Sequence, residues 1–233
     1  MATNYQPWEE FFSDLETGDI ILMQGLFESS IFTEKITNCN WSHSAIVVNA
    51  NDIQLNGIKG GPILLWESNI KDAQKGNPNN FSVTDVMLNV EKDGPMLDRL
   101  KQRITNNEVL KYDQDVAKRK LNFSRSQAMF DALKTVISEV HHDTFPAIPV
   151  EEMLNFVEGR LADIPVTDNT YFCSQLVAHT YKAWGLLNND HVDNWYAPAS
   201  FAEGSWEVKL EAGATLGSEI RLDLSTVPAY PGY

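Results

Sequence analysis

Short apolar runs bounded by turn residues fill the N-terminal part of the chain and predict β-strands. The clearest run is Ile20-Ile21-Leu22-Met23-Gln24, which follows the turn Glu16-Thr17-Gly18-Asp19. Further runs of strand length lie at residues 41–48, 63–68 and 81–88. Turn residues between 49 and 61 predict a hairpin-like connection between the second and third runs. Only residues 29–37, where apolar positions recur at roughly helical spacing, predict a short helix within this series.

From Pro95 onward the pattern changes and favours helices. Ser124 and Gln127 have the spacing of a capping box, which predicts a helix that runs to about His141. A further helix is expected after Pro149. We therefore expect residues 95–163 to form a helical insertion in the fold.

The C-terminal part combines one strong helix with two strand-like segments. The helix is expected to begin at Cys173, after the turn-prone stretch 168–170, and to end at Gly185. Its apolar positions are Phe172, Leu176, Val177, Tyr181 and Trp184. Segments 208–210 and 219–222 are expected to be strands. Strands, then helices, then returning strands predict an α+β fold in one domain over residues 1–233, with an antiparallel sheet packed against the Cys173 helix.

Composition narrows the classes of partner. The chain has 233 residues, enough for one sizeable core, and a formal net charge of -14. Such an acidic surface repels phosphate backbones, so we expect no nucleic-acid partner. The first ten residues resemble no secretory signal and no apolar run is long enough to span a bilayer, so we expect a cytoplasmic protein with no integral membrane segment. No phosphate-binding glycine loop and no metal-ligand spacing is present, so no cofactor or metal is expected, and the oligomeric state stays open.

The two cysteines, Cys39 and Cys173, are too few for a disulfide framework or a zinc site made of cysteines alone. A single bridge between them stays open, although a reduced chain is favoured. Cys173 stands at the first turn of its predicted helix, where unpaired N–H groups and the helix dipole stabilise a thiolate. Because the thiolate is a nucleophile, Cys173 is the candidate for covalent catalysis. Cys39 is expected to pack or to lie in the loop before the second strand.

A cysteine hydrolase also needs an imidazole and a polar group that orients it. His43 shares one face of its predicted strand with Ala45 and Val47, and Glu67 shares a face with Leu65 on the next strand. If these strands are antiparallel neighbours, His43 and Glu67 are cross-strand partners. The Cys173 helix, packed against the sheet, would then direct its first turn at His43.

Four segments, in this order, resemble the circularly permuted NlpC/P60 cysteine hydrolases. They are Leu15-Glu16-Thr17-Gly18-Asp19-Ile20-Ile21-Leu22, Trp41-Ser42-His43-Ser44-Ala45-Ile46-Val47, Trp66-Glu67-Ser68 and Tyr171-Phe172-Cys173-Ser174-Gln175-Leu176-Val177. The family has a permuted papain-like fold in which the histidine precedes the cysteine. It has bacterial and poxviral members, and the lecithin:retinol acyltransferase group is related. The segments span most of the chain, whereas 95–163 has no counterpart among these motifs.

The resemblance implies a hydrolase or acyltransferase that cleaves an amide or ester bond through a thioacyl intermediate. Cys173 would be the nucleophile, His43 the general base and acid, and Glu67 the residue that orients His43, at a position that varies in the family. The backbone N–H of Cys173 would contribute to the oxyanion hole, by analogy with papain-like enzymes. The substrate stays open between peptide amides, including peptidoglycan stem peptides, and lipid-like acyl groups.

The competing interpretation is a binding or host-interaction module on the same fold, whose triad has drifted and whose 95–163 segment forms the partner surface. The presence of a cysteine, a histidine and a glutamate argues against drift. A deubiquitinase-like or deamidating effector is a third interpretation that the same geometry permits.

The remaining polar candidates have structural explanations. His141 and His142 end a helix, where an imidazolium interacts favourably with the dipole. His179 is expected to be exposed on the polar side of its helix, and Asp19 to pin a turn.

Overall fold

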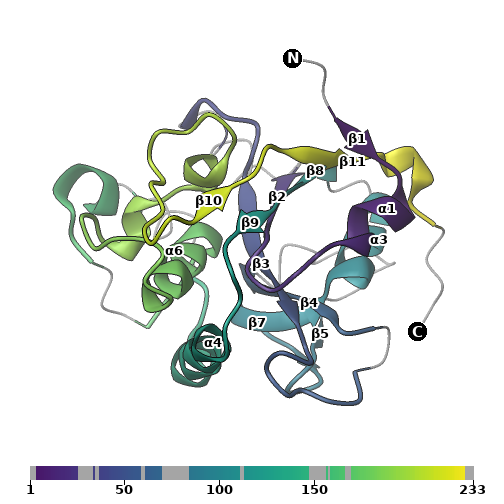
Figure 1. The fold of residues 1–233 in the computed structure, drawn as a ribbon, viewed down its shortest axis with the longest axis horizontal. Coiled ribbons are helices and arrows are strands. Elements are labelled where there is room, and N and C mark those ends of the chain that lie inside the picture. The colour runs from purple at the N-terminus through teal and green to yellow at the C-terminus, as the bar shows by residue number, and fades with distance from the viewer. Residues whose placement is uncertain are drawn as a thin grey trace.

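A seven-stranded sheet forms the centre of the computed structural model, which describes residues 4–25, 34, 37–58, 61–69, 84–110, 113–146, 156, 158–165 and 169–228 (Figure 1). Across the sheet the strands are β1 (Tyr5–Gln6), β11 (Ile220–Leu222), β8 (Asp113–Arg119), β2 (Ile20–Gly25), β3 (His43–Asn49), β4 (Ile63–Asn69) and β7 (Gly94–Arg99). Neighbours are antiparallel except β1 and β11, which are parallel. At this level the predicted α+β class is confirmed.

Smaller elements surround the sheet. The described helices of six residues or more are α1 (Trp8–Ser13), α3 (Leu100–Leu110), α4 (Gln127–Val140) and α6 (Cys173–Ala183). The 3-10 turns are η2 (Asp193–Trp195), η3 (Pro198–Phe201) and η4 (Leu224–Thr226), and the short strand pairs are β5 (Thr84–Asp85) with β6 (Val90–Glu91) and β9 (Leu121–Asn122) with β10 (Thr215–Leu216). None of the helices in these ranges combines the length and apolar character that a membrane span requires.

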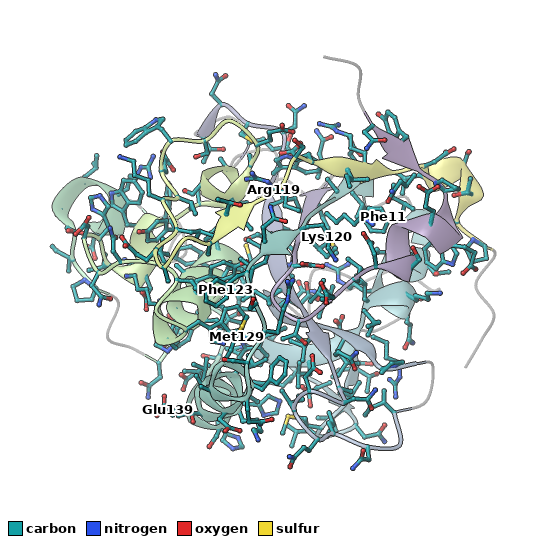
Figure 2. All side chains as sticks on the ribbon, viewed as in Figure 1. Phe11, Arg119, Lys120, Phe123, Met129 and Glu139 are labelled. Carbon is teal, nitrogen blue, oxygen red and sulfur yellow. The ribbon has the colours of Figure 1, made fainter. Side chains whose placement is uncertain are left out.

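The two faces of the sheet are buried in separate hydrophobic cores. Because side chains alternate along a strand, Ile46 and Trp66 point to one face while Ala45 and Leu65 point to the other. The first face packs against α4 and α6, and the second against α1 and α3. Figure 1 shows these helix pairs on opposite sides of the sheet, and Figure 2 shows Phe11 with the α1 side and Met129 with the α4 side.

Predicted strands in the N-terminal part agree with β2, β3 and β4, and segment 219–222 contains β11. Residues 81–83 lie outside the described residues, and the rest of the predicted strand 81–88 is wrong beyond the two residues of β5. There the Asp85 carboxylate accepts the backbone N–H groups of Met87 and Leu88, which closes a turn. The strand predicted at 208–210 is also wrong, since only a single bridge joins Leu210 to Leu187.

The predicted helical insertion over 95–163 is wrong, because that stretch contributes two strands to the main sheet. β7 includes Pro95, which an edge strand tolerates because part of its backbone lies outside the ladder. β8 lies between β2 and β11, and its polar sequence does not have the apolar run that would predict a buried strand. Its fully buried Lys118 donates to the Phe11 carbonyl at 2.8 Å and to Asp14 at 2.6 Å, which lets a lysine occupy a central strand.

Helix predictions are partly corrected. α4 ends at Val140, close to the predicted His141, but its N-cap is Ser126, whose hydroxyl accepts the Met129 N–H at 3.3 Å. The capping box predicted at Ser124 is therefore wrong. Of the helix expected after Pro149, Phe156 and residues 158–162 are described and helical, and of 29–37 only Glu34 and Thr37 are described, both helical. The rest of both segments lies outside the described residues.

Candidate active site

Helix α6 begins at Cys173, as the apolar spacing predicts. The preceding Phe172 is extended and serves as the N-cap, and its N–H donates to the Gln175 side chain at 3.3 Å. The helix ends before Gly185, whose φ of +68° is readily adopted by glycine. Cys173 is therefore the first helical residue, where the backbone N–H groups have no partner within the helix.

Side chains of β4 hold the start of α6 in place. The Trp66 indole donates to the Thr180 hydroxyl at 3.1 Å, which ties the helix to the sheet. The Ser68 hydroxyl donates to the Tyr171 carbonyl at 2.5 Å, two residues before Cys173. The first bond holds the middle of α6 against the sheet, and the second holds the residues just before Cys173 near the end of β4. In the sequence, Glu67 lies between these two anchoring residues.

The structure brings His43 and Glu67 into direct contact. His43 is the first residue of β3, and β3 pairs antiparallel with β4 through Ile46 and Trp66. The His43 Nε2 atom lies 2.5 Å from Glu67 Oε2, with the Glu67 side chain fully buried and His43 17% exposed. The predicted cross-strand partnership is confirmed as a contact, and the slight exposure of His43 connects the pair to solvent.

Cys173 interacts with the His43 imidazole as well. Burial lowers the pKa of the His43 imidazole, but the charge of Cys173, the charge of Glu67 and hydrogen bonds to both outweigh burial and raise this pKa to about 10. Because Glu67 occupies Nε2, Nδ1 is the ring nitrogen that remains for the thiol. The three residues therefore lie in the order Cys173, His43, Glu67.

Arg103 of α3 binds the other oxygen of Glu67. Its Nε atom lies 3.0 Å from Glu67 Oε1, and the Arg103 side chain is only 9% exposed. Burial tends to raise the pKa of the Glu67 carboxyl, but Arg103 and His43 lower it well below its usual range. Glu67 is thus a buried carboxylate held between two cationic partners.

α6 packs against the sheet and its first turn lies near His43, as expected, but α6 and the His43 side of β3 belong to opposite faces of the sheet. α6 packs on the face of Ile46 and Trp66, whereas Ala45 and Leu65, which alternate with His43 and Glu67, face α1 and α3. The α6 helix therefore does not pack on the face of the sheet to which the alternation along β3 assigns His43. His43 can nevertheless interact with Cys173, because it is the first residue of β3 and therefore lies at the edge of the sheet face.

The sequence patterns do not identify three residues near the triad: Ser68, Asp98 and Arg103. Ser68 belongs to the segment Trp66-Glu67-Ser68, but no local pattern reveals its bond to the Tyr171 carbonyl. Arg103 and Asp98 lie in the stretch predicted to be a helical insertion. A helix prediction there does not reveal the alternation along β7 that places Asp98 near Glu67.

Both cysteines are free, so the disulfide bond that the sequence leaves open is not formed. Cys173 is buried and Cys39 is half-buried before β3, as expected. Asp19 pins its turn as expected, since its carboxylate accepts the N–H of Glu16 and that of Leu121, each at 2.9 Å.

The surroundings of two histidines differ from the expectation. His141 is buried beyond the end of α4, where its Nε2 lies 2.8 Å from Asp85, so a hydrogen bond to this carboxylate rather than the helix dipole explains it. The His179 side chain is 29% exposed and lies 2.8 Å from Asp193, so it is half-buried rather than fully exposed. In the part of the chain that the structure describes, no group of three or more His, Cys, Asp or Glu side chains is placed to hold a metal ion.

No family model matches this chain, and no curated protein shows a significant sequence match. Among solved structures, the chain is similar to the crystal structure of the metalloprotein yiiX from Escherichia coli O157:H7. The TM-score is 0.44 at 16% identity, over 74% of this chain and 69% of that chain. A likeness this distant does not decide the family.

Proposed function

We propose that this chain is a cysteine-nucleophile hydrolase or acyltransferase with a permuted papain-like fold. It cleaves an amide or ester bond through a thioacyl intermediate, with Cys173 as nucleophile, His43 as general acid and base, and Glu67 as the residue that orients His43. The observation that carries the proposal is the contact of His43 with Glu67 at 2.5 Å while Cys173, at the first turn of α6, acts on the same imidazole.

Acylation begins with a Cys173 thiolate beside a His43 imidazolium. The sulfur attacks the substrate carbonyl carbon and forms a C–S bond, while the carbonyl electron pair moves to oxygen. When the carbonyl re-forms, the bond to the leaving nitrogen or oxygen breaks, and His43 donates its proton to the leaving group. The backbone N–H of Cys173, which has no partner within α6, is a candidate donor to the transient oxyanion.

Deacylation regenerates the starting state. Water, or an acceptor hydroxyl or amine in a transferase, gives its proton to neutral His43 and attacks the thioacyl carbon. The C–S bond breaks and Cys173 leaves as a thiolate, while His43 is again an imidazolium. Glu67 stabilises that imidazolium in both half-reactions, since its carboxylate faces Nε2 directly.

The test combines turnover with thiol labelling. We expect Cys173→Ala to abolish cleavage of every active member of a panel of peptide amides and lipid-like esters. Wild-type Cys173 should react with iodoacetamide faster than a free model thiol. Cys39→Ala serves as the matched control and should keep turnover, because burial raises the pKa of the Cys39 thiol and favours its inert form.

The opposite outcome has a definite meaning. If Cys173 titrates as an ordinary thiol near pH ~8.5 and alkylates no faster than the model thiol, the enzyme proposal fails. The same fold would then act as a binding module. Its partner surface could not be a separate block of helices over 95–163, because β7 and β8 of that stretch belong to the sheet.

A further inference from the structure

A second carboxyl group lies buried next to Glu67. Asp98 of β7 pairs in register with Leu65 of β4, so its side chain points to the same face of the sheet as Leu65 and Glu67. Asp98 is 2% exposed, and within the described ranges neither of its carboxylate oxygens has a hydrogen-bond donor. An ionised carboxylate in this position would have lost its water and gained no donor in return.

The two cations at this cluster, Arg103 and His43, both contact Glu67 rather than Asp98. The titratable and charged groups that face this cluster come from every packed strand and helix: His43 on β3, Glu67 on β4, Asp98 on β7, Arg103 on α3 and, beyond His43, Cys173 on α6. Two carboxyl groups that share one buried site do not both ionise readily, and the one whose oxygens contact no cation among the described residues keeps its proton.

We infer that Arg103 and Asp98 are positioning residues of the proposed catalytic triad, Arg103 as a cation and Asp98 as a neutral carboxylic acid that donates its proton to a hydrogen bond with Glu67. The inference rests on the proposed function for its catalytic meaning, but the charge states can be measured without a substrate.

The chemistry of Glu67 agrees with this assignment. A carboxylate has about four acceptor positions. His43 and Arg103 take one on each oxygen, Asn69 approaches Oε1 at 3.5 Å, and an Asp98 O–H supplies a further donor. Burial and the charge of Glu67 raise the pKa of Asp98 well above its usual range, which is the direction that a neutral donor requires. Glu67 is thereby fixed in one orientation against His43.

Asp98→Asn is the first test, since the amide has nearly the same shape and also donates a hydrogen bond. Infrared spectra of the full chain at pH 7 should show a protonated carboxyl band in the wild type that Asp98→Asn lacks. The pH midpoint at which Cys173 becomes reactive to iodoacetamide should be the same in both proteins. An absent band, or a midpoint that moves downward by about one pH unit on loss of a negative charge, would overturn the neutral assignment.

Arg103→Gln tests the cation. Loss of a positive charge disfavours every anion in the cluster, so the midpoint of Cys173 alkylation should move upward by at least about one pH unit, a roughly tenfold loss of reactivity below it. Arg103→Lys, which keeps the charge, should restore most of that shift. Lys101→Gln is the matched control on α3, because Lys101 is 37% exposed and pairs only with Glu9 among its ionic partners in the described residues.

The outcomes separate the two proposals. If Arg103→Gln is folded by circular dichroism and keeps the wild-type midpoint, Arg103 is merely structural and the inference fails. If Arg103→Gln does not fold, Arg103→Lys and the infrared band of Asp98 still decide. A protein with no turnover on any substrate but with the Asp98 band and the Arg103 shift would refute the proposed function and support the charge arrangement.

Discussion

Replacing Glu67 by glutamine tests the electrostatic centre of the site. The substitution keeps the size of the side chain and removes the charge that lies 2.5 Å from His43 Nε2. An opposite charge at such a distance typically shifts a pKa by about 1–3 units, equivalent to about 1.4–4 kcal/mol. The pKa of His43, which is about 10 in the folded protein, should therefore fall by that amount in Glu67→Gln.

Nuclear magnetic resonance of the histidine rings measures this directly in the full chain, with the His43 signals assigned from their loss in His43→Gln. Turnover on any cleaved amide should fall as well, because the imidazolium that protonates the leaving group loses the carboxylate that orients and stabilises it. The variant should also be less stable by about 3–5 kcal/mol, since Arg103 keeps a buried charge without its carboxylate. Urea unfolding reports that loss separately.

Asp193→Asn is the matched control, because Asp193 lies 2.8 Å from His179 in a second pair of a carboxylate and a histidine. It should leave the titration of His43 unchanged. The reasoning is refuted if His43 titrates at the same pH in folded Glu67→Gln as in the wild type, since the carboxylate would then contribute nothing to the imidazolium.

Other predictions concern stability. Because the folded-state pKa of His43 (about 10) lies above its ordinary value of 6.5, its stabilising effect is complete below pH 6.5 and disappears as pH rises through about 10. Urea unfolding of wild type and His43→Gln should converge over that interval, and parallel curves would contradict this. Tyr181→Phe should cost about 1–3 kcal/mol, because the buried hydroxyl donates to the Gly18 carbonyl at 2.6 Å, whereas exposed Tyr5→Phe should cost nothing measurable. Gly18→Ala should also lower the free energy of unfolding by about 1–3 kcal/mol, since φ is +98° and the new Cβ would lie 2.8 Å from the Leu121 side chain. Melting temperatures equal to that of the wild type would refute the predictions for Tyr181→Phe and Gly18→Ala.

Local patterns sufficed for the elements that carry the triad. β2, β3 and β4 have apolar runs of strand length bounded by turns, and such runs reflect burial that neighbouring residues share. The start of α6 at Cys173 follows from helical spacing after a turn and a stop at Gly185. His43, Glu67 and Cys173 could be selected from these elements, because their residue types and order limit the chemistry.

Local patterns failed where burial depends on distant partners. β8 resembles a polar segment because its buried Lys118 is satisfied by Phe11 and Asp14, which are remote in the chain. β7 carries Pro95, which discourages a strand assignment unless the strand is known to lie at the sheet edge. Both facts belong to the assembled sheet, so local patterns miss the two strands that lie beside α3 and α4 within 95–163.

The sequence by itself determined the α+β class and the set of reactive side chains, since a strand period, a helix start and a residue type are all local properties. The tertiary structure decided how these groups interact. Packing of α3 and β7 brings Arg103 and Asp98 to Glu67, and the position of His43 at the end of β3 lets Cys173 reach it from the other face of the sheet. The physical reason is that charge states depend on desolvation and on neighbours, which exist only after the strands have assembled.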